Sequence, residues 1–277
     1  MNIVQHLIEV VSALDELKVR HLVMGGHAVR YYGFNRDTTD HDLHIPIDAG
    51  QHLSELLSQT TLFVSGIPTE TPTWRGEDFR RFVLGTLPDG KEELLEFWIR
   101  NHLLDDFESL YQRREVGIYG ERQVSFLSLP DLLRSKETER DNDWDDIKIL
   151  EDILDQRNIA AARRSGDVVA ALASLRSIRG LDSAFREDLL ADSQVVATAL
   201  RKANNPITYA YLLPFAPAVE RELPSSEILV PLLRQNLAQT MPCSTRHQLL
   251  IEAVRLRYKR TLQEIDRQEK INRRRQL

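Results

Sequence analysis

Cysteine is nearly missing from this 277-residue chain, since Cys243 is the only one. One thiol can form neither an internal disulfide nor a thiolate metal cluster, which fits a reducing compartment. Long apolar runs are missing too: no stretch approaches the roughly 18 to 20 apolar residues that a membrane helix needs. We therefore expect a soluble, cytoplasmic protein without a membrane partner.

An excess of positive charge is missing overall, because 42 Asp and Glu outnumber 36 Lys and Arg and give a formal net charge of -6. Its distribution is uneven, however. Residues 244–277 contain ten Lys or Arg and four Asp or Glu, a local charge of +6. A basic tail suits a polyanion such as RNA, and it equally suits a solvated tail with no partner.

Hydrophobic residues make up 42% of the chain, enough for a sizeable core, and the length favours two domains. Strand-like and helix-like patterns alternate up to about residue 156, and helical spacing prevails beyond it. We predict an α+β fold with a mixed sheet flanked by helices over residues 1–156. A helical domain is expected over residues 157–277, with a basic amphipathic helix from residue 247 to residue 267.

Local signals place individual elements. The turn sequence Pro88-Asp89-Gly90 separates two strand-like segments, residues 80–87 and 92–100, and predicts a β-hairpin. Apolar periodicity and turn residues predict helices over 3–17, 51–58, 168–178, 185–201 and 226–237, helical turns over 28–32, a buried strand over 21–24, a strand or hairpin within 116–127, and a helix capped by Ser128.

Two glycines and two aspartates form the most informative pattern. Gly25-Gly26 precede a helical segment, and Asp40 and Asp42 lie on a strand predicted over residues 40–45. Because side chains alternate across a strand, both carboxylates face the same way. Aligned carboxylates suit hard cations such as Mg²⁺, and a glycine turn lets the backbone approach a phosphate. Taken singly, a glycine pair is more often a simple turn and an Asp-x-Asp an exposed face.

A third carboxylate, Glu96, is expected on the second strand of the predicted hairpin. Leu95, Phe97 and Ile99 form the apolar face of this strand, so Glu96 points to the other face. This orientation matches the one inferred for the two aspartates. Three carboxylates on one side suit a pair of Mg²⁺ ions and metal-assisted phosphoryl transfer. The alternative is a solvated glutamate on the surface.

Together these residues resemble the DNA polymerase β-like nucleotidyltransferase superfamily, whose motif is a Gly-Gly or Gly-Ser turn, then Asp-x-Asp, then a carboxylate on a later strand. The stretch from Val23 to Asp42, VMGGHAVRYYGFNRDTTDHD, is most similar to minimal prokaryotic nucleotidyltransferases that include toxins of abortive-infection toxin-antitoxin systems. Those proteins continue with a helix containing Lys and then Arg-x-x-Asp-x-x-Asp-Ile. Here Ser135-Lys136 and Arg140-Asp-Asn-Asp143-Trp-Asp-Asp146-Ile147 match, so the resemblance covers about residues 20–150.

The resemblance implies an enzyme that moves a nucleoside monophosphate from an NTP to an acceptor hydroxyl with two Mg²⁺ ions. Asp40, Asp42 and Glu96 would be the catalytic and metal-binding residues. RNA such as tRNA, a protein hydroxyl and a small molecule such as an antibiotic are all open as acceptors, and a cognate antitoxin protein is a possible partner. The implied nucleotide-binding residues are Gly25, Gly26, Arg36, which braces the loop before the aspartates, Lys136, which neutralises the triphosphate, and Asp143, which orients the helix of that lysine.

Two departures from the family pattern leave other interpretations open. The residue between the aspartates is normally apolar, but here it is His41, which we interpret as a hydrogen-bonded core histidine; and Glu96 stands where Asp is common. The alternative function is a catalytically impaired nucleotidyltransferase-fold binding module that acts on a protein partner. A third interpretation, in which Asp-x-Asp is structural, predicts that Asp40, Asp42 and Glu96 lie far apart.

Overall fold

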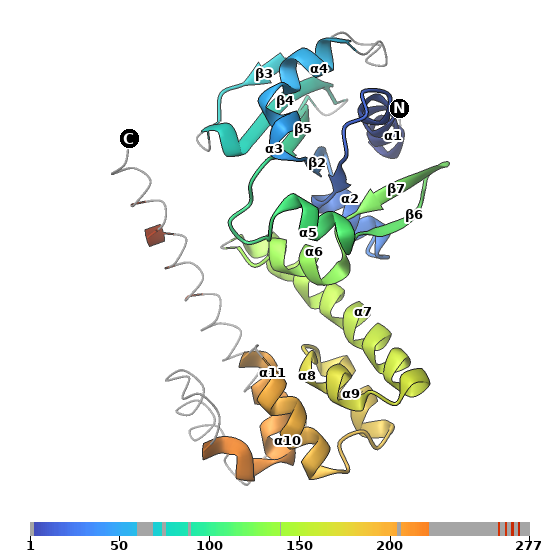
Figure 1. Ribbon diagram of the computed structural model, residues 1–277, viewed down its shortest axis with the longest axis vertical. Helices are drawn as coiled ribbons and strands as arrows, with labels where there is room; N and C mark the ends of the chain where they lie inside the picture. Colours follow the sequence, from blue (N-terminus) through green and yellow to red (C-terminus); the bar gives the residue numbers. More distant parts are fainter. Residues whose placement is uncertain are drawn as a thin grey trace. The chain divides into compact units, whose positions relative to one another are not determined.

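The computed structural model describes residues 3–59, 69–73, 76–87, 90–138, 140–203 and 206–221, and the single residues 260, 264, 267, 268 and 271. The chain divides into two compact units, Met1–Lys136 and Glu137–Leu277; Figure 1 draws the first from blue to green and the described part of the second mainly from yellow-green to orange. Apart from the single positions, the basic helix predicted over 247–267 lies outside the described residues, as does the segment 226–237.

Within the described residues, the first unit is built on a seven-stranded mixed sheet with the order β3-β4-β5-β2-β1-β7-β6. β2 pairs with β5 and β1 with β7 in parallel, whereas the remaining neighbours are antiparallel. β2 is therefore the middle strand, shielded on both edges. The strands are β1 Leu22–Val23, β2 Asp40–His44, β3 Thr69–Thr71, β4 Phe79–Thr86, β5 Glu92–Trp98, β6 Glu115–Tyr119 and β7 Arg122–Phe126.

The helices of the first unit follow from apolar stripes and caps. In α1, Leu7 and Leu14 are completely buried, as expected for one face of an amphipathic helix. Ser128 caps α6 by accepting a hydrogen bond from the Asp131 amide, which confirms the predicted cap. The helices are α1 Ile3–Glu16, α2 Gly25–Tyr31, α3 Ile47–Gln51, α4 Leu53–Gln59, α5 Phe107–Gln112, α6 Leu129–Ser135 and the 3-10 turn η1 Gly76–Asp78.

The predicted hairpin is present as β4 and β5, and it contains one irregularity. The pairing shifts by one residue between Val83 and Gly85, as in a β-bulge. Without this shift Phe82 would lie opposite Glu96; with it, Arg81 takes that position. A one-residue change of register exchanges the two faces of a strand, so the bulge decides which side chain meets Glu96.

The second unit consists of helices around a separate apolar core, in which Leu172, Leu175, Leu200 and Tyr211 are completely buried. α7 ends at Gly166, whose positive φ of 79° terminates a helix without steric cost. The domain boundary predicted at residue 156 lies inside α7, whereas the two compact units divide between Lys136 and Glu137. The boundary at residue 156 stays a prediction. The elements are α7 Asp141–Ser165, α8 Val168–Ala173, α9 Ile178–Arg186, α10 Ser193–Lys202, α11 Pro206–Leu212 and the 3-10 turns η2 Leu213–Phe215 and η3 Pro217–Arg221.

The α+β class is confirmed, with a mixed sheet flanked by helices and a helical C-terminal part. Some local predictions need correction. α2 begins at Gly25 itself, earlier than expected. α4 covers most of the helix predicted over 51–58, whereas the short α3 before it was not predicted. β3 and α5 were not predicted. Among the described helices, none combines the length and apolarity needed to cross a bilayer.

Candidate active site

The carboxylates of Asp42 and Glu96 come together because β2 and β5 pair in parallel with these residues directly opposite each other. Asp40 lies two residues earlier on the same side of β2. Both aspartates are half-buried, and Glu96 is 8% exposed. Asp42 and Glu96 are close enough for their carboxyl groups to share a hydrogen bond. This convergence contradicts the interpretation in which the three residues lie far apart.

The glycine turn packs directly against Asp42. A Cβ atom placed on Gly25 would lie 1.9 Å from Asp42 Oδ2, and one on Gly26 would lie 2.4 Å from Thr38 Oγ1. Gly25 also has a positive φ of 59°, which other residues rarely adopt. The backbone amide of Met24 donates to the carbonyl of Asp42 at 2.9 Å. The close packing of the turn against Asp42 and Thr38 therefore requires glycine at positions 25 and 26.

The electrostatics of this cluster disfavour three ionised carboxylates in the absence of a cation. Burial, and then the neighbouring Asp42, raise the pKa of Glu96 to about 8, although Arg81 opposes the shift. Burial and Asp42 likewise raise the pKa of Asp40. An opposite charge beside such groups favours their ionised forms. Three oxygen-donor side chains that repel one another therefore fit a divalent cation such as Mg²⁺.

Arg81 is a member of the cluster that the sequence pattern did not reveal. It lies opposite Glu96 on β4, and its Nε and Nη2 atoms are 2.7 and 2.6 Å from Glu96 Oε1. A guanidinium held this close partly neutralises the buried carboxylate. The predicted hairpin already placed Arg81 on the strand that pairs with the strand of Glu96. Which residue of that strand lies opposite Glu96 depends on the bulge, however, and the hairpin prediction did not include it.

The other proposed nucleotide-binding residues come from three different parts of the chain. The Nε of Arg36 donates to the carbonyl of Asp37 at 3.2 Å in the loop before β2. Lys136 is buried and forms the C-cap of α6, a helix that contacts α2. Asp143 belongs to the second unit, where Thr138 Oγ1 donates to its Oδ2 at 2.6 Å. Their roles toward a nucleotide stay predictions.

The opposite face of β2 carries a buried chain of polar groups. His41 is completely buried; its Nδ1 is 3.0 Å from His27 Nε2, and its Nε2 is 2.7 Å from Glu93 Oε1. His27 continues the chain to the Tyr119 hydroxyl, 3.0 Å from its Nδ1. His6 of α1 completes it by bonding Glu93. His41 is thus a hydrogen-bonded core histidine, as predicted, whereas Glu93 was missed because the sequence does not show which strands pair.

Two pKa shifts define the charge state of this chain. Burial, reinforced by the nearby His41, lowers the pKa of His27 to about 3, so this imidazole is neutral near pH 7. Burial alone would raise the pKa of Glu93, but hydrogen bonds from His41 and His6 outweigh it and lower the pKa. Glu93 is therefore an anion inside the protein, held by two imidazoles.

Among known proteins, the chain is similar to several solved structures. No protein-family model and no curated protein matches the chain. An antigenic nucleotidyltransferase-like protein from Paracoccidioides brasiliensis is 20% identical with a TM-score of 0.38, over 61% of this chain and 91% of that one. The lincosamide antibiotic adenylyltransferase LnuA with bound lincomycin is 18% identical with a TM-score of 0.39, over 54% and 96%.

A third structure, a candidate nucleotidyltransferase from H. pylori, is 13% identical with a TM-score of 0.36, over 95% of this chain and 96% of that one. Likenesses of this size give no residue a role and identify no substrate. The function has to be inferred from the side chains themselves.

Proposed function

We propose that this chain is a Mg²⁺-dependent nucleotidyltransferase that moves a nucleoside monophosphate from an NTP to an acceptor hydroxyl. The observation that supports it most directly is the row of Asp42 and Glu96 on neighbouring strands, with Asp40 two residues away and Gly25 against the Asp42 carboxylate. This set offers oxygen ligands to a hard cation beside a backbone that a phosphate can approach.

Each of the three carboxylates has a place in the reaction. Asp40, Asp42 and Glu96 would hold Mg²⁺, which, when bound, stabilises the charge on the entering and leaving oxygens. The acceptor oxygen forms a bond to the α-phosphorus, the bond from the α-phosphorus to the oxygen of the β-phosphate breaks, and pyrophosphate leaves. Glu96, which a bound cation would hold in its ionised form, would take the proton of the acceptor hydroxyl.

The nucleotide would lie against the glycine turn. By the motif resemblance, the backbone at Gly25 and Gly26 would contact the phosphates, and Lys136 would neutralise the triphosphate. Arg36 would brace the loop before β2, and Asp143 would orient the helix of Lys136. The roles of these five residues toward a nucleotide are inferred from the motif resemblance.

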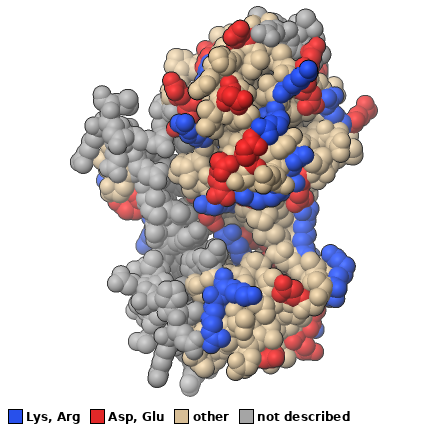
Figure 2. Space-filling view, viewed as in Figure 1, with Lys and Arg blue, Asp and Glu red and all other residues tan. Residues whose placement is uncertain are grey.

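The acceptor and partners belong to the same proposal. RNA is the acceptor that the basic C-terminal segment favours, and tRNA comes first among RNAs only by the family resemblance. A cognate antitoxin would fit a toxin-like enzyme. On the face shown in Figure 2, the described Lys and Arg side chains are interspersed with Asp and Glu. No broad basic surface is visible among the described residues on that face, and the proposal of an RNA acceptor is based on the basic segment 244–277.

The alternative is a catalytically impaired binding module that acts on a protein partner. It would keep the fold and the nucleotide turn but not transfer a nucleotide. His41, the polar residue between the two aspartates, is the feature that favours it. Product formation separates the two functions directly.

The test incubates the purified chain with Mg²⁺, each α-labelled NTP in turn and total RNA, and resolves the products on a gel. Asp42→Asn removes one metal-binding charge at nearly constant size, so label transfer should be abolished while the circular dichroism spectrum stays unchanged. Asp48→Asn is the matched control, because Asp48 is exposed on α3 of the same unit. It should transfer label as the wild type does.

The distribution of label decides among acceptors. Label in an RNA band establishes RNA as the acceptor, whereas label on protein or on a small molecule keeps the chemistry and changes the substrate. Transfer that persists in Asp42→Asn would refute the assignment of the site. Complete absence of label with all acceptors would favour the binding module.

A further inference from the structure

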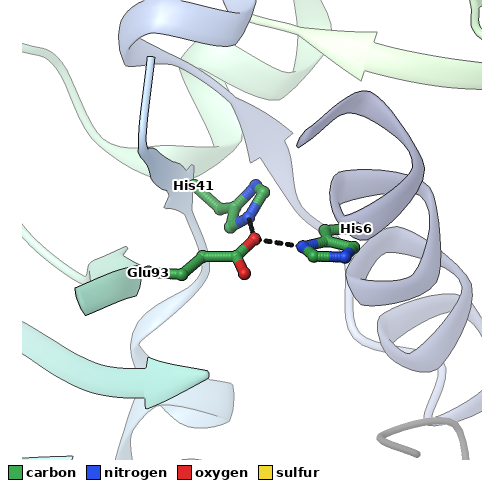
Figure 3. Close-up of side chains that lie close together, drawn as sticks. All are labelled: His6, His41 and Glu93. Atoms are coloured by element: carbon green, nitrogen blue, oxygen red, sulfur yellow. Dashed lines mark hydrogen bonds and ion pairs between the residues drawn. The ribbon is translucent and has the colours of Figure 1, made fainter. Parts of the chain in front are cut away.

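His6, His41 and Glu93 form a compact cluster on the face of the sheet opposite Asp42 and Glu96 (Figure 3). They come from α1, β2 and β5, and one potential ligand atom from each lies within 4.8 Å of the others. Figure 3 shows the Glu93 carboxylate between the two imidazoles, where Oε1 contacts His6 Nδ1 and His41 Nε2. Two nitrogens and one carboxylate converge here.

The donor types separate this cluster from the carboxylate site. Mg²⁺ prefers oxygen ligands, whereas Zn²⁺ binds imidazole nitrogen readily and is often held by three protein ligands and one water. We propose that His6, His41 and Glu93 bind one Zn²⁺ ion, with water as the fourth ligand, at a site separate from Asp40, Asp42 and Glu96. The ion would fasten α1 to the two strands that carry the catalytic carboxylates.

The surroundings of His41 are those of a metal ligand. A ligating histidine usually donates its other ring N–H to a hydrogen-bond partner that fixes its orientation. His41 Nδ1 has such a partner in the neutral His27, whose Nε2 is 3.0 Å away, and His27 Nδ1 can donate to the Tyr119 oxygen at 3.0 Å. With His41 Nε2 on the metal, the ring N–H of His41 and that of His27 each still have an acceptor.

The same chain can run in the opposite direction when no metal is bound. Tyr119 then donates to His27, His27 donates to His41, and His41 Nε2–H donates to Glu93. Metal binding thus reverses the tautomer of two buried histidines. Because the ring nitrogen that carries hydrogen is visible by ¹⁵N NMR, the tautomer reports whether the ion sits in this cluster and not elsewhere.

Access and spacing are compatible with an ion. The His6 side chain is 19% exposed, against 0% for His41 and 6% for Glu93, so the cluster opens to solvent beside His6. His6 Nε2 is also buried without a hydrogen-bond partner among the described residues. Ligands of one Zn²⁺ at 2.0–2.1 Å lie about 3.3 Å apart. The 2.7 Å between His41 Nε2 and Glu93 Oε1 must therefore widen by roughly half an ångström.

The experiment removes metal from the full-length chain with a chelator and titrates Zn²⁺ against a chromophoric competitor. We expect one Zn²⁺ per chain in the wild type and an affinity at least about 100-fold lower in His6→Gln, since even partners of metal ligands contribute 10- to 100-fold. His52→Gln is the matched control because His52 is exposed. Asp42→Asn should keep the wild-type affinity, which separates this site from the proposed active site.

Two results of the Zn²⁺ titration would overturn the proposal. One is equal Zn²⁺ affinity in the wild type and in His6→Gln; the other is loss of binding in Asp42→Asn, which would place the ion at the carboxylates. Glu93→Gln keeps the side-chain size while removing the anion, so it serves as a second ligand variant if His6→Gln folds poorly. In the wild type, Zn²⁺ should move the hydrogen of His41 from Nε2 to Nδ1, and an unchanged tautomer would also refute the site.

Discussion

Replacing Glu96 by glutamine should make the metal-free protein more stable. The pKa of this carboxyl group is about 8 in the folded chain, against 4.5 for the unperturbed group. At pH 7 an unfolded chain has released this proton, while the folded chain still holds it. Glutamine is neutral and similar in size, so the variant avoids the cost of keeping a buried carboxyl group protonated.

The sign and size follow from proton linkage. Below about pH 4.5 both states are protonated, and Glu96 contributes nothing to the pH dependence. Above it the unfolded state binds fewer protons, so stability falls by about 1.4 kcal/mol per pH unit until the pH reaches the folded pKa. At pH 7 this amounts to roughly 3 kcal/mol, and at 2–4 °C per kcal/mol the midpoint of the variant should rise by roughly 6–12 °C.

Calorimetry in a metal chelator between about pH 5 and pH 8 measures this difference. The advantage of Glu96→Gln should be small near pH 5 and grow toward pH 8, whereas Glu92→Gln, an exposed glutamate on the same strand, should show no such trend. A variant that is no more stable than the wild type, or a difference independent of pH, would refute the raised pKa that burial and then Asp42 give Glu96.

Magnesium should reverse the order of stability. A ligand that binds only the folded state stabilises it by mass action. Saturating Mg²⁺ should therefore raise the midpoint of the wild type strongly and that of Glu96→Gln weakly, because the variant has lost one ligand. Equal Mg²⁺-dependent shifts in both proteins would show that Glu96 does not hold the metal.

Two smaller changes test other contacts. Gly25→Ala should abolish label transfer, because its Cβ would lie 1.9 Å from Asp42 Oδ2, while the positive φ costs about 1–2 kcal/mol; Gly76→Ala has a similar φ of 57° but open space, and should keep transfer. Ser128→Ala should lower the stability by about 1 kcal/mol in urea unfolding, because the Asp131 amide loses its cap; an unchanged midpoint would contradict this.

Much of the site could be predicted because strand alternation is a local property. The period of two placed Asp40 and Asp42 on one side of β2 and His41 on the other, and His41 is completely buried. The apolar residues Leu95 and Phe97 are completely buried in the same way. Side chains whose position depends only on their own strand were therefore assigned to the correct face.

Contacts that depend on pairing between strands could not be predicted. Arg81 reaches Glu96 only because of the bulge between Val83 and Gly85. A glycine within a strand is compatible with a bulge, but it does not fix the pairing register. Glu93 meets His41 because β2 and β5 are parallel neighbours, a non-local choice made by the whole sheet. Local patterns give the face of a side chain, whereas its partner across the sheet depends on register.

The position of His41 bears on whether the chain is an impaired relative of an enzyme. A buried imidazole without partners would strain the middle strand, since burying an unpaired polar group costs about 1–3 kcal/mol. Both ring nitrogens of His41 have partners, however. Its side chain lies on the face of the sheet opposite Asp42 and Glu96. On the other face Asp42 remains opposite Glu96 and in contact with Gly25. A polar residue accommodated on one face leaves the geometry of the other unchanged, so His41 gives no physical reason to expect lost catalysis.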